Sequence, residues 1–329
     1  MAKKRISPTA IFIACEGRNT EPLYLESIAE QVEDEGLLAI TIYPDKDIPN
    51  PKTDALNLIR EAQSKGDEFD EVWAVFDKDG YTKHEEAFDL AINGQREVKI
   101  AFSSIAFEHW ALLHFTKCDN AFQKSDCKDD REHVLLCGTG QNANDCHGQR
   151  CVAGYMREHN FCKDYAKSGN YYFNHLDKKE IAFKNAAWLR YKMRLNLNEQ
   201  NNKIYQINPY TDVDVLVKRL FCITTNYIWT GLNERVETDN FSIYVEKTED
   251  SFNVQLNNKS KQSFIFNQIN YQNHFQTLTT NGVQIDLTLK STIIIEPNTM
   301  QLVRLTPKEF GGVLIFKNEQ DEILIDLSS

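Results

Sequence analysis

Two aspartates spaced by one residue follow a short apolar run in the first third of the chain. Val72 to Phe76 are all apolar, and Asp77 and Asp79 come directly after them, followed by Gly80. A short continuous apolar run predicts a strand that is buried on both faces of a sheet. Alternate residues of an extended strand point the same way, so both carboxylates should project to one side. Carboxylate oxygens are the ligands that Mg²⁺ and Mn²⁺ prefer, so the pattern predicts a metal site at a strand end.

The same short pattern also occurs in three different structures. Gly80 could simply bend a polar turn at the end of the strand. An EF-hand loop is disfavoured, because the glycine comes too early after Asp77 and because the acids follow a strand. A phosphatase of the haloacid-dehalogenase type is similar from Asp77 to Tyr81. However, the basic residue and the acidic pair that such enzymes carry on later strands are not apparent in this chain.

A third acid follows an earlier apolar run. Ala10 to Cys15 predicts another buried strand, with Glu16 at its end. Open α/β sheets bind their ligands at the carboxyl ends of the strands. If the two strands are neighbours, Glu16, Asp77 and Asp79 converge at one edge of the sheet. Such a set could hold one or two Mg²⁺ ions, which activate water and stabilise charge on a scissile phosphate.

The elements that would position these acids alternate between strand and helix. Thr20 is expected to cap a helix that has Pro22 in its first turn. Alternation of this kind predicts an α/β fold with a mostly parallel sheet flanked by helices. His109 and His114 lie on an apolar helix and are expected to be packed. The expected helices are 21–32, 53–64, 82–93, 106–115 and 178–197, and the further strands are 38–43 and 98–103.

From Phe241 onward the pattern changes to short alternating runs separated by Asn, Ser, Thr and Gly. Regular short strands predict an all-β, sandwich-like domain. We expect a first domain at 1–235 and a second at 236–329. The second carries 7 Lys and Arg against 12 Asp and Glu, so a binding or oligomerisation module is expected there, with a homo-oligomer as one outcome. The expected strands are 241–245, 252–256, 263–266, 283–289, 292–296, 302–305, 313–316 and 323–325.

Composition limits the class of protein. The chain has 329 residues, of which 41% are hydrophobic and 26% are charged, as in globular proteins. No apolar run is long enough to cross a bilayer, and the N-terminal residues lack the apolar core of a signal peptide, so no membrane partner and a cytoplasmic location are expected. The net charge of −11 argues against broad polyanion coating but leaves room for a local basic patch.

Six of the eight cysteines fall between Cys118 and Cys162, in an insert at about 116–165. Thiolate and imidazole ligands together select Zn²⁺. The spacing lacks paired C-x-x-C knuckles, so a structural zinc site and a set of reduced cysteines both remain open. If zinc is bound, the expected ligands are Cys137, Cys146, His147 and Cys151.

A basic stretch runs from Lys163 to Arg194. It has eight Lys and Arg against three Asp and Glu, with aromatic residues interleaved. Cations beside aromatic rings suit a phosphate backbone and unstacked bases. The alternative is an amphipathic helix with its rings in the core and its cations in solvent. The expected nucleic-acid contacts are Lys163, Lys167, Lys184, Arg190, Lys192 and Arg194.

About residues 8–222 resemble the Toprim fold of topoisomerases, primases and OLD-type nucleases, and more specifically the RloB family, which is related to the AbiL abortive-infection proteins. The motifs that carry the resemblance are Glu16 to Glu21 with Tyr24, Val75 to Asp79, Ser104 to Phe115, and Asn208 to Val213 before Leu216-Val217.

The resemblance implies a metal-dependent nuclease that cleaves DNA or RNA, with tRNA among the candidates, as an effector of bacterial anti-phage defence. It also implies an ATPase partner encoded nearby. Glu16 takes the position of the Toprim glutamate, and Asp77 and Asp79 take those of the metal-binding pair. Glu21 and Glu108 match acids of the RloB pattern; each could be a ligand, while Glu21 could serve the helix dipole and Glu108 could form an ion pair. The alternative is a non-nucleolytic sensor or scaffold subunit of an ATPase-containing defence complex.

Overall fold

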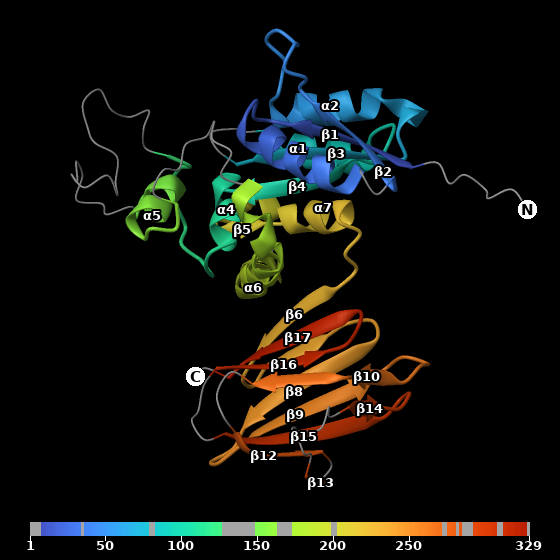
Figure 1. The fold of residues 1–329 in the computed structure, drawn as a ribbon, viewed down its shortest axis with the longest axis vertical. Helices are drawn as coiled ribbons and strands as arrows, with labels where there is room; N and C mark the ends of the chain where they lie inside the picture. The colour runs from blue at the N-terminus through green and yellow to red at the C-terminus, as the bar shows by residue number, and fades with distance from the viewer. Residues whose placement is uncertain are drawn as a thin grey trace, which may run out of the picture. The chain divides into compact units, whose positions relative to one another are not determined.

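The computed structural model describes residues 8–33, 36–78, 83–126, 149–162, 173–198, 203–271, 275–280, 283–284, 292–307 and 312–327. The chain divides into two compact units, Met1–Ile223 and Thr224–Ser329 (Figure 1). The boundary lies earlier than the expected one at residue 235, because β6 (Asn226–Gly231) and β7 (Arg235–Glu237) pair with strands of the second unit. Within the described ranges, no helix has the length and apolar character needed to cross a membrane.

The first unit is built around a five-stranded sheet in the order β2-β1-β3-β4-β5. The first four strands are parallel to their neighbours, and β5 runs antiparallel to β4. The predicted α/β class with a mostly parallel sheet is therefore confirmed, although the antiparallel edge strand makes the sheet mixed. The strands are β1 (Thr9–Cys15), β2 (Leu38–Tyr43), β3 (Glu71–Asp77), β4 (Lys99–Ser104) and β5 (Tyr210–Thr211).

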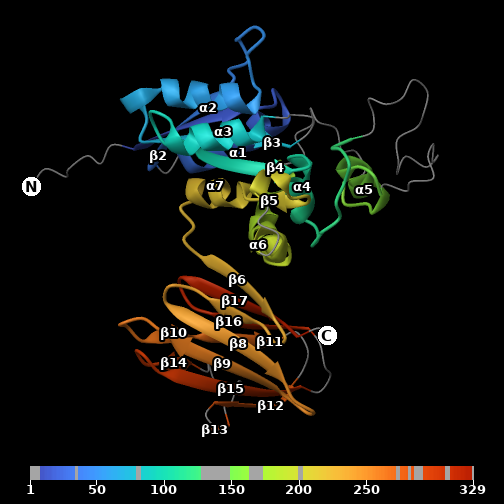
Figure 2. The same cartoon turned by 180° about the vertical axis from the view of Figure 1, so that it is seen from behind.

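Helices cover both faces of this sheet. α2 (Ala55–Ser64) and α3 (His84–Asn93) lie on one face, and α1 (Thr20–Glu33) and α7 (Val213–Leu220) lie on the other (Figures 1 and 2). Phe76 of β3 packs in one apolar cluster with buried residues of α2 and α3. Side chains alternate along a strand, so Asp77 projects to the opposite face, which α1 and α7 cover.

The remaining helices of the first unit follow β4. They are α4 (Glu108–Leu113), α5 (Val152–Glu158) and α6 (Lys179–Asn198), with 3₁₀ turns η1 (Gly66–Glu68), η3 (Phe173–Lys178) and η4 (Ile204–Gln206). Asn185 of α6 donates to the carbonyl of Leu113 at 2.7 Å, which ties α6 to the end of α4. Burial lowers the pKa of His109 and of His114 to about 4, so both are neutral and packed, as predicted.

The second unit contains only strands within its described residues. Its sheets have the orders β13-β12-β15-β9-β8-β7, β11-β16-β17-β6 and β10-β14. Buried residues of the two larger sheets, such as Val254 and Ile323, belong to one apolar cluster, which is how two sheets pack in a sandwich. The strands after β7 are β8 (Phe241–Lys247), β9 (Phe252–Asn258), β10 (Phe264–Phe266), β11 (Gln268–Tyr271), β12 (Phe275–Thr280), β13 (Val283–Gln284), β14 (Ile293–Ile295), β15 (Met300–Pro307), β16 (Val313–Lys317) and β17 (Asp321–Asp326).

Candidate active site

Glu16 and Asp77 lie at the carboxyl ends of neighbouring strands. β1 pairs directly with β3, with Cys15 opposite Val75. The N–H of Glu16 donates to the carbonyl of Val75 at 2.9 Å. In return, Oε2 of Glu16 accepts the N–H of Asp77 at 2.9 Å. The predicted adjacency of these two acids is confirmed, and the Glu16 side chain itself links the two strand ends.

The backbone of Asp77 is also held on its carbonyl side. Nε2 of His84 lies 3.0 Å from the Asp77 carbonyl oxygen. A carbonyl oxygen can only accept, so this nitrogen carries the proton. His84 begins α3 and is buried beside the rings of Phe76 and Phe102. Both polar groups of the Asp77 backbone are therefore fixed at the strand end, and His84 is a contact that sequence reasoning missed.

The carboxylate of Glu21 lies directly against Gly17. A Cβ atom at Gly17 would come within 2.0 Å of Glu21 Oε2 and 2.9 Å of its Cδ, so a larger residue would collide with this carboxylate. Glu21 lies in the first turn of α1 and its exposed fraction is only 5%. α1 begins at Thr20, so this residue is inside the helix and is not its cap as expected. The glycine after Glu16 makes room for a second carboxylate beside the first.

Glu108 brings a further buried acid to the same face of the sheet. It begins α4 just beyond the carboxyl end of β4, and its exposed fraction is 2%. The ring of Tyr24 in α1 lies 5.6 Å from that of Phe107 and 6.5 Å from that of Trp110, with an edge-on geometry in both pairs. These contacts hold the first turns of α1 and α4 together, and with them Glu21 and Glu108.

The donor chemistry of this edge fits a hard divalent cation. Glu16, Asp77, Glu21 and Glu108 offer carboxylate oxygens, and no sulfur or imidazole ligand accompanies them in the described contacts. Asp79, the third predicted ligand, lies outside the described residues. Within the described part of the chain, no three His, Cys, Asp or Glu side chains are arranged to hold a metal ion. Mg²⁺ or Mn²⁺ binding therefore stays a prediction.

The predicted zinc ligands fall mostly outside the described residues. Cys137, Cys146 and His147 all lie there. Cys151 is buried just before α5, and Cys118 and Cys162 are buried free thiols. Zinc binding by this segment remains a prediction.

The six predicted nucleic-acid contacts are not equivalent. Lys163 and Lys167 lie outside the described residues. Arg190 forms a two-armed ion pair with the buried carboxylate of Asp214, so we leave it out of the proposed surface. Arg194 packs its guanidinium 3.8 Å from the ring centre of Tyr191 on the same helix. Lys184 is half-buried and Lys192 is exposed, and these two cations of α6 are the ones we retain in the proposed surface.

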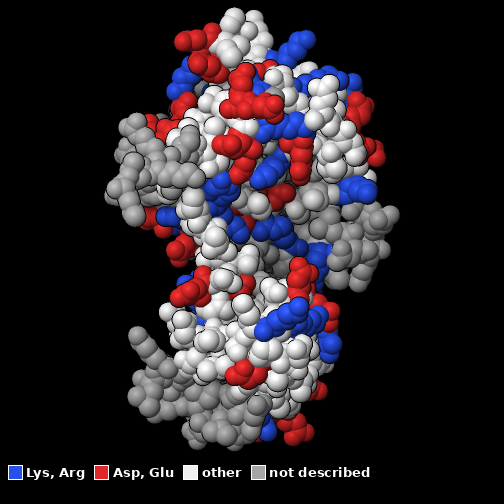
Figure 3. Space-filling model, turned by 90° about the vertical axis from the view of Figure 1, so that its right-hand side faces the viewer, with Lys and Arg blue, Asp and Glu red and all other residues white. Residues whose placement is uncertain are grey.

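The aromatic residues of the basic stretch mostly face the protein. Phe183 is buried and stacks on Trp110 at 6.2 Å. Trp188 lies under the ammonium group of Lys117 at 5.5 Å. On the face shown in Figure 3, positive and negative side chains are interspersed over the first unit, and positive ones gather toward its α6 and α7 end. Any nucleic-acid contact there would depend on cations more than on stacking rings.

Asp212 is a second residue whose role sequence reasoning missed. Its Oδ1 accepts the N–H of Phe102 at 2.6 Å, which joins the start of α7 to β4. Burial raises the pKa of Asp212 to about 7, against the weaker lowering effect of that hydrogen bond and of Arg190. The only signal in the sequence is its place in the motif Asn208 to Val213.

We expect this carboxyl group to make the stability of the first unit fall between about pH 4 and pH 7. A raised pKa means that the folded chain holds the proton more tightly than the unfolded chain. The stabilisation is therefore complete below about pH 4 and is lost as the pH rises through about 7. Asp212→Asn keeps the acceptor oxygen without the charge, so its melting temperature should rise relative to wild type as the pH increases.

The measurement is a series of melting curves from pH 4.5 to 8 for wild type, Asp212→Asn and Asp67→Asn. Asp67 is exposed, so its variant controls for the loss of one negative charge at the surface. A constant difference between Asp212→Asn and wild type across the series would contradict the prediction.

Comparison with known proteins agrees with this architecture. An α/β unit with acids at the carboxyl edge of its sheet is matched by the family model described as RloB-like protein, over residues 11–220. The chain belongs to the RloB-like protein family. The match ends at the last residue of α7 and so leaves out the second unit.

Solved structures add little to this. The apo PCuAC domain of PmoF2 has a TM-score of 0.21 and 10% identity, covering 29% of this chain and 93% of that one. The copper-bound PCuAC domain of PmoF2 also has a TM-score of 0.21, with 11% identity and coverage of 29% and 96%. Scores this low carry no argument. A search of curated proteins finds no match.

Proposed function

We propose that the chain is a Toprim-like, Mg²⁺- or Mn²⁺-dependent nuclease that cleaves phosphodiester bonds of DNA or RNA as an effector of bacterial anti-phage defence. tRNA is among the candidate substrates, and an ATPase encoded nearby is the proposed partner. Membership of the RloB-like family supports the proposal. The second unit would serve as a binding or oligomerisation module.

One observation carries the proposal. Glu16 and Asp77 lie on neighbouring parallel strands, and the Glu16 carboxylate accepts the N–H of Asp77 at 2.9 Å. A Toprim-like site requires its first-strand glutamate beside the aspartate pair of a later strand, and the order of the sheet is compatible with that requirement. The presence of Glu16 also favours a nuclease over a phosphatase of the haloacid-dehalogenase type.

The residues that would hold the metal are Glu16, Asp77 and Asp79, with Glu21 or Glu108 as a further oxygen ligand. When bound there, the ion would activate water and stabilise negative charge on the scissile phosphate. The contribution of the chain is positional. His84 and Glu16 fix the backbone of Asp77, and Gly17 lets the carboxylate of Glu21 approach that edge.

The experiment is a cleavage assay with plasmid, single-stranded DNA and total tRNA in Mg²⁺ or Mn²⁺. Wild type is compared with Glu16→Ala, Asp77→Ala and a control, Asp70→Ala. Asp70 is a carboxylate at the opposite end of the same sheet, where it accepts the N–H of Ala10 at 2.7 Å. We expect wild type and the control to cleave at least one substrate, and both site variants to be inactive.

Failure of wild type to cleave any substrate calls for the same assay with the neighbouring ATPase present. Cleavage that appears only then supports a nuclease that its partner restrains or activates. No cleavage in either case supports the alternative, a sensor or scaffold subunit. Cleavage that survives in Glu16→Ala and Asp77→Ala would contradict the proposed site.

Charge reversal at Lys184 and Lys192 is expected to weaken nucleic-acid binding and to lower the salt slope of log K by about two, roughly one for each lost phosphate contact. The measurement is fluorescence anisotropy with a labelled single strand at several salt concentrations. Lys247→Glu with Lys259→Glu is the control, because both are exposed lysines of the acidic second unit. Equal affinity and slope in the two double variants would exclude the α6 surface.

A further inference from the structure

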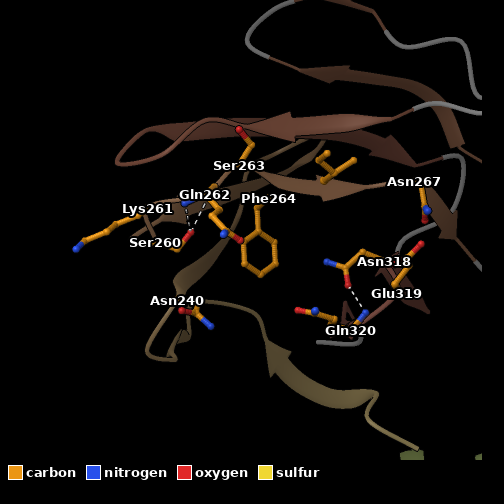
Figure 4. Close-up of a pocket in the computed structure, with 11 residues that line it drawn as sticks. Asn240, Ser260, Lys261, Gln262, Ser263, Phe264, Asn267, Asn318, Glu319 and Gln320 are labelled. Atoms are coloured by element: carbon orange, nitrogen blue, oxygen red, sulfur yellow. Dashed lines mark hydrogen bonds between the residues drawn. The ribbon is translucent and has the colours of Figure 1, made fainter. Parts of the chain in front are cut away.

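A pocket of about 620 Å³ lies within the second unit. Its walls come from the turn before β8, the β9–β10 turn, β10 and the β16–β17 turn (Figure 4). The volume is in the range of small-molecule sites, about 300–1,000 Å³. Most such sites are apolar with a few polar groups, but this one is lined mainly by amide and hydroxyl side chains. We infer that the pocket binds a neutral saccharide, an inference that does not depend on the proposed nuclease function.

Phe264 supplies an aromatic surface inside the pocket. Its ring lies 5.1 Å from that of Phe241 and 5.5 Å from that of Phe266, measured between ring centres. These two rings support Phe264 from the core, and Figure 4 shows its own ring among the lining residues. The C–H groups on one face of a hexose are apolar enough to pack on such a ring, while the hydroxyl groups remain at its edge.

Three side-chain amides around this ring are available to a ligand. Within the described residues, no hydrogen bond involves the side-chain amides of Asn240, Gln262 or Gln320, although their backbones are bonded. Each amide offers two N–H donors and one carbonyl acceptor. A sugar hydroxyl both donates and accepts, so it can satisfy either end of an amide. A ligand with several hydroxyl groups matches this set.

The turns that present these amides are held in place. The buried side chain of Asn258 donates to the carbonyls of Gln262 and Ile295 at 2.7 and 2.8 Å. Across the pocket, Oδ1 of Asn318 accepts the N–H of Gln320 at 2.8 Å and that of Asp321 at 2.7 Å. Because the backbone of each turn is fixed, a ligand would have to order only the side chains.

The charges of the lining favour a neutral ligand. Lys261 and Glu319 are the charged residues that line the pocket, and their charges cancel. In Figure 4 the ammonium group of Lys261 points away from the ring of Phe264. The excess of acids in residues 236–329 also disfavours nucleic acid here.

The test is saturation-transfer NMR followed by titration calorimetry on the full chain. The probes are D-glucose, D-galactose, D-mannose, N-acetyl-D-glucosamine, maltose and cellobiose. We expect at least one of them to bind. Phe264→Leu keeps the apolar volume but removes the ring face, and Gln262→Ala removes an amide from an exposed turn. Each should weaken binding about tenfold, while Asn270→Ala, an exposed amide of β11 outside the pocket, should not.

Several results would overturn the inference. One is the absence of binding by all six sugars at 20 mM, on the order of the weakest affinity that a site this size should show. Another is binding that Asn270→Ala weakens as much as Gln262→Ala does. A third is binding that Phe264→Leu and Gln262→Ala both leave unchanged while their melting temperatures stay at the wild-type value.

Discussion

Replacing Arg190 by Met is expected to lower the free energy of unfolding of the first unit by about 3–5 kcal/mol, the usual cost of removing one partner of a buried ion pair. The carboxylate of Asp214 has an exposed fraction of 0%, and Nη2 of Arg190 lies 2.9 Å from its Oδ2. Nη1 contacts the other carboxylate oxygen and also donates to the carbonyl of Thr211 at 2.9 Å. Without the guanidinium, the nearest cation among the described ion pairs of this carboxylate is Lys218, at 3.6 Å.

The measurement is urea denaturation of wild type, Arg190→Met and the double variant Arg190→Met/Asp214→Leu. The double variant should recover much of the loss, because neither charge then remains buried. Arg304→Met, which breaks the exposed pair with Asp250, is the control and should leave the first transition unchanged. A midpoint for Arg190→Met as high as that of the control would contradict the prediction.

This result would also change how binding data are interpreted. Arg190 lies in the basic stretch, so a loss of nucleic-acid affinity in Arg190 variants could be attributed to a lost phosphate contact. The ion pair with Asp214 predicts instead that such a loss reflects damage to the packing of α6 on α7. Lys192, which is exposed, is the sounder choice for testing the surface.

Gly17→Ala is expected to reduce metal-dependent cleavage by roughly 10- to 100-fold, the usual effect of disturbing the surroundings of a metal ligand. The new Cβ would come within 2.0 Å of Glu21 Oε2, so the buried carboxylate must move away from the edge that holds Glu16. A second readout is the rise in melting temperature on adding Mn²⁺, which should be smaller in the variant.

Two further variants make this prediction specific. Gly17→Ala/Glu21→Ala should cleave no more slowly than Glu21→Ala alone, because the collision partner is gone. Gly94→Ala introduces a comparable collision with Gln63 and with the carbonyl of Leu90, at the end of α3. It should lower the melting temperature but leave the Mn²⁺ response intact. Equal loss of that response in Gly94→Ala and Gly17→Ala would show a general effect of destabilisation.

Much of the first unit could be predicted from periodicity. The strands at 10–15, 38–43, 72–76 and 98–103 lie within one or two residues of their observed bounds, because each is a clear apolar or alternating run between turns. β5 has only two residues, and such a length carries no period. In the second unit, the sequence of β11 and β12 is rich in Gln, Asn and Thr, so these strands lacked an apolar signal.

The candidate site divides in the same way. Glu16 and Asp77 could be placed together because each ends a buried strand and because parallel strands bring their carboxyl ends to one edge. His84, Asp212 and the partner of Arg190 could not be found. Each acts through a hydrogen bond or ion pair between elements, and no local pattern records such a pairing.

The parallel pairing of β6 with β17 has a consequence for how the chain is made. β6 is the first strand of its unit to leave the ribosome, but Ile228 and Trp229 must wait for Ile323 and Leu324 before their strand has a neighbour. The first unit has all five strands of its sheet once Thr211 has emerged. It can therefore fold during translation, whereas the second unit closes late, and a chain that stops before Asp321 would leave β6 with an open edge.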